Sequence, residues 1–217
     1  MTETLELNEG NESLSRFLSF WQRVGAKGNG RNVFSSLAAQ YSERHRAYHN
    51  LTHINAMLDE FEQVRHLASN QDAIESAVWY HDAVYDTRAK DNEEQSAVLA
   101  SHVLRSAGLS EDFNQLVNKL ILATKHSAEP IELDTQLLVD IDLSILGQPE
   151  HVFDKYEENI RKEYEWVPDD AFKAGRSTVL QQFLNREFIY STEFFRGKYE
   201  VQARKNITRS LEQLANI

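Results

Sequence analysis

Apolar residues recur at three- and four-residue steps along almost the whole chain, and this periodicity constrains the fold more than any other feature. Such spacing places the apolar side chains on one face of an α-helix. In the first predicted helix, 11–24, these residues are Leu14, Phe17, Leu18, Trp21 and Val24. Further stripes occupy, in chain order, residues 33–41, 54–64, 74–81, 91–108, 110–120, 134–147, 152–160, 172–183 and 193–214.

Signals for helix starts fall between these stripes. Asp72 with Glu75, and Asp91 with Glu94, have the spacing of a capping box, in which the first residue caps the helix. Ser110 precedes two acidic residues and is typical of an N-terminal cap. Glycine and proline are scarce, with 8 and 3 residues, so few positions favour turns or extended segments.

The sequence therefore predicts an all-α fold of about nine or ten helices without strands. We expect residues 1–217 to form a single domain. Its core would span about 33–147, because this segment contains all of the unusual polar groups described below. The N-terminal helix, 11–24, and the C-terminal helices, 148–217, would pack on that core.

Composition excludes several classes of function. The formal net charge of −11 disfavours broad nucleic-acid binding. A small phosphorylated ligand is compatible with it, because a bound cation and a few basic residues can reverse the sign inside a pocket. The chain has no cysteine, which excludes disulfides, thiolate metal sites and a cysteine nucleophile.

No feature of the sequence indicates a membrane protein. No uninterrupted apolar stretch approaches the ~20 residues that a spanning helix needs. The first residues, MTETLELNEG, are polar and acidic and do not resemble a signal peptide. We expect a cytoplasmic protein with no membrane partner.

Two histidines and an adjacent aspartate are the residues most indicative of function. His81 continues the apolar stripe of 74–81, so it points inward, and Asp82 follows it directly. His53 lies on a separate inward face, beside Ala56 and Met57. A single histidine at the end of an apolar stripe is more often a satisfied core residue. The second histidine and the neighbouring carboxylate favour a metal site instead.

Asp140 and Asp142 both follow an apolar run, but they point about 200° apart on a helix, so only one can face a shared cavity. Asp142 lies on the face of Leu138 and Ile145, where an unpaired carboxylate is costly to bury. Asp140 lies nearer polar neighbours. Asp142 is therefore the better ligand candidate, and convergence with two imidazoles and Asp82 on one cation would offset its burial.

His49 has two interpretations. It stands one helical turn before His53 if the helix extends back that far. If Asn50 caps the helix instead, His49 lies outside it and suits a substrate-binding or supporting role.

The ordered set His53, His81-Asp82 and Asp142 resembles the H…HD…D pattern of the HD superfamily. Longer phrases resemble its branch of predicted metal-dependent HD phosphohydrolases, namely residues 46–51, 79–86, 91–97, 160–164 and the pair Gly175-Arg176. The resemblance covers about residues 14–214. It implies an HD-type helical domain in which His53, His81, Asp82 and Asp142 bind a divalent metal and water hydrolyses a phosphate ester.

The chain departs from this pattern at one position. Some HD nucleotidases have a Glu three positions after the motif Asp, where this chain has Tyr85, followed by Asp86. The resemblance suggests Glu93 as the general base, with Asp86 as a further catalytic candidate. Glu93 can equally be an acidic residue that stabilises the helix dipole.

Other polar residues near the motifs are candidates for binding substrate or for supporting the metal ligands. Arg46, Lys125 and Arg176 could neutralise phosphate. Each could instead be a solvated surface charge, and for Lys125 this second interpretation is favoured. His126 could bind a second metal or protonate the leaving group, or it could satisfy a helix end. The remaining candidates in this group are Tyr48, His49 and Asn92.

The ligand set suits Mn²⁺, Fe²⁺, Zn²⁺, Ni²⁺ or Mg²⁺. The sequence thus predicts a metal-dependent phosphomonoesterase or phosphodiesterase acting on a nucleotide or another small phosphorylated metabolite. A non-catalytic metal- and nucleotide-binding sensor of HD fold is the alternative. A di-iron carboxylate bundle would need two Glu-x-x-His motifs, and the chain has none. The oligomeric state, the native metal and the particular substrate stay open at this point.

Overall fold

The computed structural model describes residues 2–215, and within them it contains ten α-helices, two 3₁₀ helices and no strand. The all-α prediction is confirmed. The helices are α1 (Thr2–Arg23), α2 (Gly30–Tyr41), α3 (Leu51–Val64), α4 (Gln71–Tyr80), α5 (Asn92–Ser106), α6 (Glu111–Ala123), α7 (Leu133–Asp142), α8 (Glu150–Glu163), α9 (Asp169–Leu184) and α10 (Glu193–Ala215), with the 3₁₀ helices η1 (Arg65–Leu67) and η2 (Leu143–Gly147).

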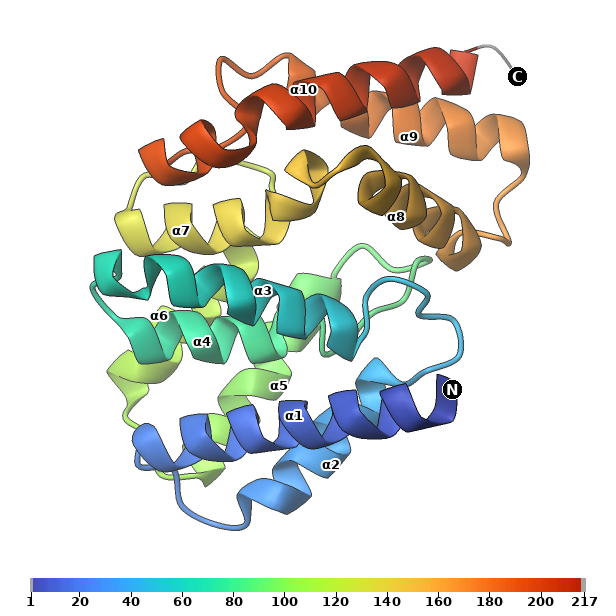
Figure 1. Cartoon of the computed structure of the whole chain (residues 1–217). Coiled ribbons are helices and arrows are strands. Elements are labelled where there is room, and N and C mark those ends of the chain that lie inside the picture. The colour runs from blue at the N-terminus through green and yellow to red at the C-terminus, as the bar shows by residue number, and fades with distance from the viewer. Residues whose placement is uncertain (1, 216–217) are drawn as a thin grey trace.

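The helices are stacked in layers, with α1 and α2 at one end and α9 and α10 at the other (Figure 1). Between them lie α3, α4, α6 and α7, which contact one another. The whole of α4 from Ala73 to Tyr80 is buried. A helix that is buried on all sides belongs at the centre of a core. The chain leaves this central helix at His81, so the histidine begins its loop inside the protein.

Two predicted helix starts are confirmed. The Asn50 side chain accepts a hydrogen bond from the Thr52 amide and caps α3, which leaves His49 outside the helix. Ser110 caps α6 through the Phe113 amide. Both caps satisfy backbone N–H groups that have no partner within the first helical turn.

The start predicted at Asp72 is wrong, because Asn70 caps α4 by accepting a hydrogen bond from the Ala73 amide. Glu75 does not reach back to the helix start, since its carboxylate pairs with Arg23 and Arg65. Two arginines outcompete a single local amide for this buried carboxylate.

Two further helix starts differ in detail. Asp91 stands directly before α5 as predicted. Its side chain accepts a hydrogen bond from the side-chain amide of Gln95 and makes no cap hydrogen bond to the backbone. Asp134 lies inside α7, which begins at Leu133. Its carboxylate accepts hydrogen bonds from the backbone amides of Ser69 and Asn70. The Asp134 side chain thus contacts a distant segment and does not cap its own helix.

The first helix begins at Thr2 rather than near residue 11. The apolar stripe thus marks only part of this helix, because helix formation does not itself need an apolar face. The Glu and Leu residues that precede the stripe have favourable helix propensities.

The C-terminal helices pack on the rest of the chain through η2. The Asn206 amide on α10 donates hydrogen bonds to the carbonyl oxygens of Leu146 and Gln148. Gly147 lies against the Tyr199 ring, and a Cβ atom at Gly147 would stand only 2.4 Å from the Tyr199 Cβ. This contact fixes the end of the α7–η2 segment that carries Asp142. No described helix is long and apolar enough to cross a membrane.

Candidate metal centre

His81 caps the C-terminus of the central helix and is almost wholly buried, with 2% of its surface exposed. Its Nδ1 lies 3.0 Å from the Val78 carbonyl oxygen. A carbonyl oxygen only accepts, so Nδ1 carries a proton, and Nε2 is the ring nitrogen directed at the cluster. A backbone carbonyl that fixes the imidazole in this way is a common support for a metal-binding histidine.

His53 reaches the same point from the first turn of α3. Its Nε2 lies 3.3 Å from the Nε2 of His81. The cap at Asn50 sets where α3 begins and therefore which way His53 points. Two imidazole nitrogens this close cannot both carry protons facing each other without repulsion, whereas two lone pairs can share a cation.

Asp82 follows His81 in a loop that Arg46 holds in place. The Arg46 guanidinium is buried and donates hydrogen bonds to the carbonyl oxygens of Asp82, at 2.6 Å, and Ala83, at 3.1 Å. Arg46 therefore fixes the backbone of the HD pair. The Asp82 carboxylate then lies 3.0 Å from His81 Nε2 and 3.8 Å from His53 Nε2.

Asp142 ends α7 and approaches the two histidines from a third helix. One carboxylate oxygen lies 3.4 Å from His53 Nε2 and 3.8 Å from His81 Nε2. Asp140 faces elsewhere and accepts hydrogen bonds from the backbone amides of Ser191 and Thr192. The structure thus places Asp142, and not Asp140, beside the histidines.

The separations fit coordination of one cation. The ligand atoms of His53, His81 and Asp82 all lie within 4.8 Å of one another. Two atoms that are each about 2.1 Å from a metal are about 3.0 Å apart in octahedral geometry and about 3.4 Å apart in tetrahedral geometry. The pairs described above lie in that range or up to 0.4 Å beyond it. The two imidazole nitrogens and the Asp82 oxygen suit a divalent transition metal, and an Asp142 oxygen stands next to this group.

The electrostatics also favour positive charge at this point. Burial would lower the pKa of His81, but Asp82 and then Asp142 outweigh it and raise that pKa to about 9. Burial would raise the pKa of Asp142, but hydrogen bonds from His126 and His53 hold it well below its usual range. The two carboxylates are therefore ionised and stabilise a cation between them.

His126 joins the cluster from the loop after α6. Its Nε2 lies 2.9 Å from the second oxygen of Asp142. Its backbone has a φ of 53°, which is unusual for a residue other than glycine. The structure thus places the His126 side chain on the Asp142 carboxylate rather than on the carbonyls of a helix end.

His49 is held by a buried carboxylate that the sequence analysis did not single out. Glu163 at the end of α8 accepts from His49 Nδ1 at 2.6 Å and from the Tyr85 hydroxyl at 2.9 Å. Its other oxygen accepts the backbone amides of Tyr48 and His49. These bonds fix the loop that leads into α3. The Nδ1 of His49 donates to Glu163, so the Nε2 of the same ring makes no contact with that carboxylate.

A signal for Glu163 is present in the sequence. Phe153, Tyr156 and Ile160 form the apolar stripe of α8, and Glu163 continues it at the next three-residue step. A charged residue in line with buried apolar residues requires a partner. The partner His49 is 114 positions away, so the sequence alone could not identify it.

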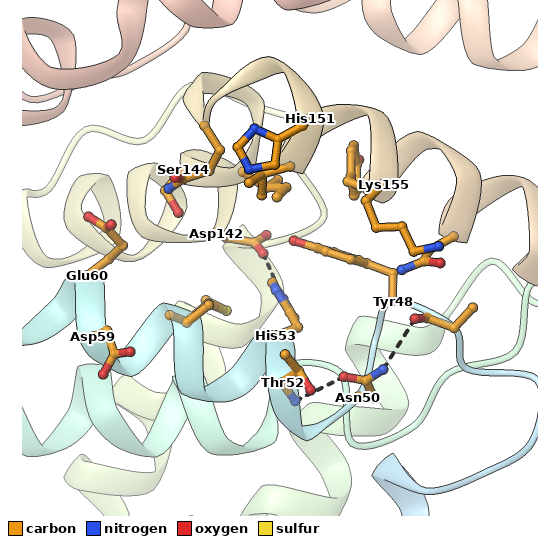
Figure 2. A pocket seen from close by; sticks show the side chains of 18 residues that line it. Tyr48, Asn50, Thr52, His53, Asp59, Glu60, Asp142, Ser144, His151 and Lys155 are labelled. Atoms are coloured by element: carbon orange, nitrogen blue, oxygen red, sulfur yellow. Dashed lines mark hydrogen bonds and ion pairs between the residues drawn. The ribbon is translucent and has the colours of Figure 1, made fainter. Parts of the chain in front are cut away.

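A cavity of about 780 Å³ opens beside the cluster between α3 and α8. His53 and Asp142 line it, whereas His81 and Asp82 do not. Figure 2 shows the Tyr48 side chain crossing the cavity with its hydroxyl directed toward Asp142. The Tyr48 ring also lies against His53, with ring centroids 4.8 Å apart. Tyr48 thus separates the ligand group from the outer cavity.

The two candidate catalytic acids lie in different settings. Glu93 is in the first turn of α5 with one oxygen 3.8 Å from Lys125 Nζ. Asp86 is exposed, accepts a hydrogen bond from the Arg88 amide and lines a second cavity, distinct from the one beside His53. Asn92 bonds the Asp86 backbone through both of its side-chain atoms and closes this loop.

The three predicted phosphate-binding cations are all engaged by other groups. Arg46 donates to carbonyl oxygens as described above. Lys125 pairs with Glu94 and donates to the Lys90 carbonyl. Arg176 pairs with Glu157 and donates to the Tyr156 hydroxyl.

Comparisons of the chain with family models, curated proteins and solved structures found no match. The candidate site therefore depends on the positions and contacts of its own residues.

Proposed function

We propose that the protein is a metal-dependent phosphohydrolase of the HD type, which acts on a small phosphorylated substrate through a metal-activated water. The observation that supports this most is the convergence of His53, His81, Asp82 and Asp142 from separate helices. Buried imidazoles and partly buried carboxylates at these separations fit one divalent cation, and His53 and Asp142 line a cavity.

In this proposal His53, His81, Asp82 and Asp142 hold the cation, and the rest of the site positions them. When bound, a divalent cation would lower the pKa of a coordinated water and polarise a phosphoryl oxygen. Four protein ligands leave positions free in an octahedral site for water and a phosphate oxygen. Val78 orients His81, and Arg46 orients Asp82.

His49, His126 and Tyr48 surround the four ligands and are the side chains suited to moving a proton or contacting the phosphate. Glu163 holds His49 through Nδ1, which leaves Nε2 as the atom that exchanges a proton. His126 donates to Asp142. Tyr48 presents its hydroxyl on the cavity side of the same carboxylate.

The test begins with metal content. We expect purified protein incubated with Mn²⁺, Fe²⁺, Zn²⁺ or Ni²⁺ and then desalted to retain about one metal ion per chain, measured by elemental analysis. A panel of phosphorylated metabolites should then show phosphate release. The double variant His81→Ala, Asp82→Ala should lose both properties, and His66→Ala, which removes an exposed histidine on η1, should keep them.

Phosphate release that survives the double variant would overturn the proposal. Metal retention and ligand binding without turnover for any metal or ester would instead favour the sensor function. The Tyr85 position gives that alternative its support, because Tyr85 donates to Glu163 and supplies no carboxylate to the site.

A further inference from the structure

The cavity beside the metal cluster has a mainly apolar wall. Met57 on α3, Ile145 on η2 and Val152 on α8 line it together with the rings of Tyr48 and Tyr156. The two rings meet edge to face, with centroids 4.6 Å apart. At about 780 Å³ the cavity has the size of a small-molecule site. Its wall suits an uncharged body that is apolar or aromatic.

The cavity contains very little positive charge. Among its lining residues, the basic side chains are Lys155, His151 and the candidate ligand His53. Lys155 pairs with Glu158 at 3.0 Å and its side chain is 60% exposed, so it stands at the rim (Figure 2). Asp59 and Glu60 also line the cavity. Glu60 already receives hydrogen bonds from Lys198 and the Tyr199 hydroxyl.

Basic residues outside the lining cannot easily supply the missing charge. Arg46 is buried and committed to three carbonyl oxygens. Arg176 and Lys125 are held by the carboxylates of Glu157 and Glu94. Releasing any of them would leave a buried carbonyl or a carboxylate without its partner, which carries its own free-energy cost.

The charge balance therefore limits the substrate. A phosphate monoester carries about two negative charges at neutral pH, and Asp82 and Asp142 already offset the charge of a divalent cation, so even a single phosphate brings net negative charge to the site. Each further phosphate adds negative charge inside a cavity that offers no unpaired buried cation among the described residues. The formal net charge of −11 adds a long-range repulsion of polyanions.

We infer that the ligand of this cavity is a monoester with a single phosphate and a neutral, apolar or aromatic body, which lies along Met57, Ile145 and Val152. Nucleoside di- and triphosphates, and sugars with several phosphates, are excluded by their charge. Ser144 and Asn159 offer hydrogen bonds to neutral polar groups of the body. This inference rests on the proposed metal centre and specifies the ligand of that same site.

A matched ligand series tests the inference. Isothermal titration of Mn²⁺-loaded protein with adenosine mono-, di- and triphosphate keeps the body constant while the charge increases. We expect the dissociation constant to rise at least about tenfold from mono- to triphosphate. Phenyl phosphate should bind more tightly than glycerol phosphate, because only the former has an apolar body.

A designed cation in the wall provides the second test. Val152→Arg should reduce the difference between the dissociation constants of adenosine mono- and triphosphate. Val98→Arg, at an exposed position on α5, should leave this difference unchanged. Circular dichroism establishes that each variant is folded. If Val152→Arg does not fold, Ile145→Lys makes the same test from η2.

Binding and turnover separate the two proposals. Equal or tighter binding of the triphosphate, or tighter binding of glycerol phosphate than of phenyl phosphate, would overturn the inference even if phosphate esters are hydrolysed. Preferred binding of monophosphates without any turnover would support the inference and contradict the phosphohydrolase function.

Discussion

Asp140 and Asp142 are two positions apart on α7, and their carboxylates contact different parts of the protein. Asp140 is fully buried, and every partner it has is an N–H or O–H group of Ser191 and Thr192, just before α10. Asp142 is partly exposed, and its partners are the imidazoles of His53 and His126. One carboxylate fastens the C-terminal helices, and the other faces the candidate metal centre.

The comparison shows that burial alone does not mark a functional carboxylate. Burial raises the pKa of Asp140, although its hydrogen bonds oppose the change. The pKa of Asp142 is lowered despite burial, because imidazoles surround it. The chemistry of the partners separates the two carboxylates. The partners of Asp140 are neutral donors, which stabilise the fold, whereas the partners of Asp142 are imidazoles, which can bind a metal once they are deprotonated.

The largest expected difference between the two carboxylates is in metal binding. Asp142→Asn removes one of four ligands, so we expect the metal dissociation constant to rise more than about 100-fold and turnover to fall at least as much. Asp140→Asn should change the dissociation constant less than about threefold. Competition with a chromophoric chelator measures both values. Equal losses in the two variants would show that the metal is not held by Asp142.

The second prediction reverses the order of effects for stability. Asp140→Ala leaves two backbone amides and the Thr192 hydroxyl without an acceptor inside the protein, so we expect it to lower the free energy of unfolding by ~2–4 kcal/mol. Asp142→Ala should cost less in metal-free protein, because Asp142 is partly exposed and water can replace it as the hydrogen-bond partner of His126. Urea unfolding without metal measures both. A larger loss for Asp142→Ala would contradict the division of roles.

The third prediction concerns Glu163, which shares features of both carboxylates. Burial would raise its pKa, but the hydrogen bond and charge of His49 lower the pKa to about 2. An acid with a lowered pKa contributes stability above its unfolded value, about 4.5, and loses it as the pH falls toward 2. We expect Glu163→Gln to be ~2–3 kcal/mol less stable than the natural protein at pH 6. This difference should shrink as the pH falls from about 4.5 to about 2.

The control for this effect is Glu165→Gln, an exposed acid two positions away, which should show no such pH dependence. Nitrogen chemical shifts of the His49 ring give an independent readout. The natural protein should show a protonated Nδ1, and Glu163→Gln should weaken that preference. If the stability difference between the natural protein and Glu163→Gln stays constant from pH 6 to pH 2, the charge of Glu163 does not account for its stabilising effect.

The smallest effect is expected at Asp86. Its carboxylate already accepts the Arg88 amide in an exposed turn, and Asn can make the same hydrogen bond. Asp86→Asn should therefore keep turnover within about twofold of the natural protein. Glu93→Gln makes the corresponding change at Glu93, the other candidate catalytic acid, and its turnover is measured in the same assay. A loss of about 100-fold for Asp86→Asn would assign Asp86 to catalysis after all.

The sequence predicts those parts of the molecule that depend on local spacing. The three- to four-residue periodicity identified the helices, and the rotation between Asp140 and Asp142 indicated which one shares a face with Leu138 and Ile145. The capping box predicted at Asp72 and Glu75 was wrong because Arg23 pairs with both carboxylates.

Contacts between distant segments could not be predicted in the same way. Glu163 and His49 are 114 residues apart, and the Arg46 guanidinium reaches the Asp82 carbonyl across 36 residues. In both cases the sequence shows only that a charged residue needs a partner. The three-dimensional arrangement decides which partner it receives.

The most direct test of the metal centre is an anomalous difference map from crystals of the protein grown with Mn²⁺. We expect one strong peak within about 2.4 Å of His53 Nε2, His81 Nε2 and an oxygen each of Asp82 and Asp142. A peak that lies elsewhere, or no peak in crystals soaked to saturation, would contradict the central proposal.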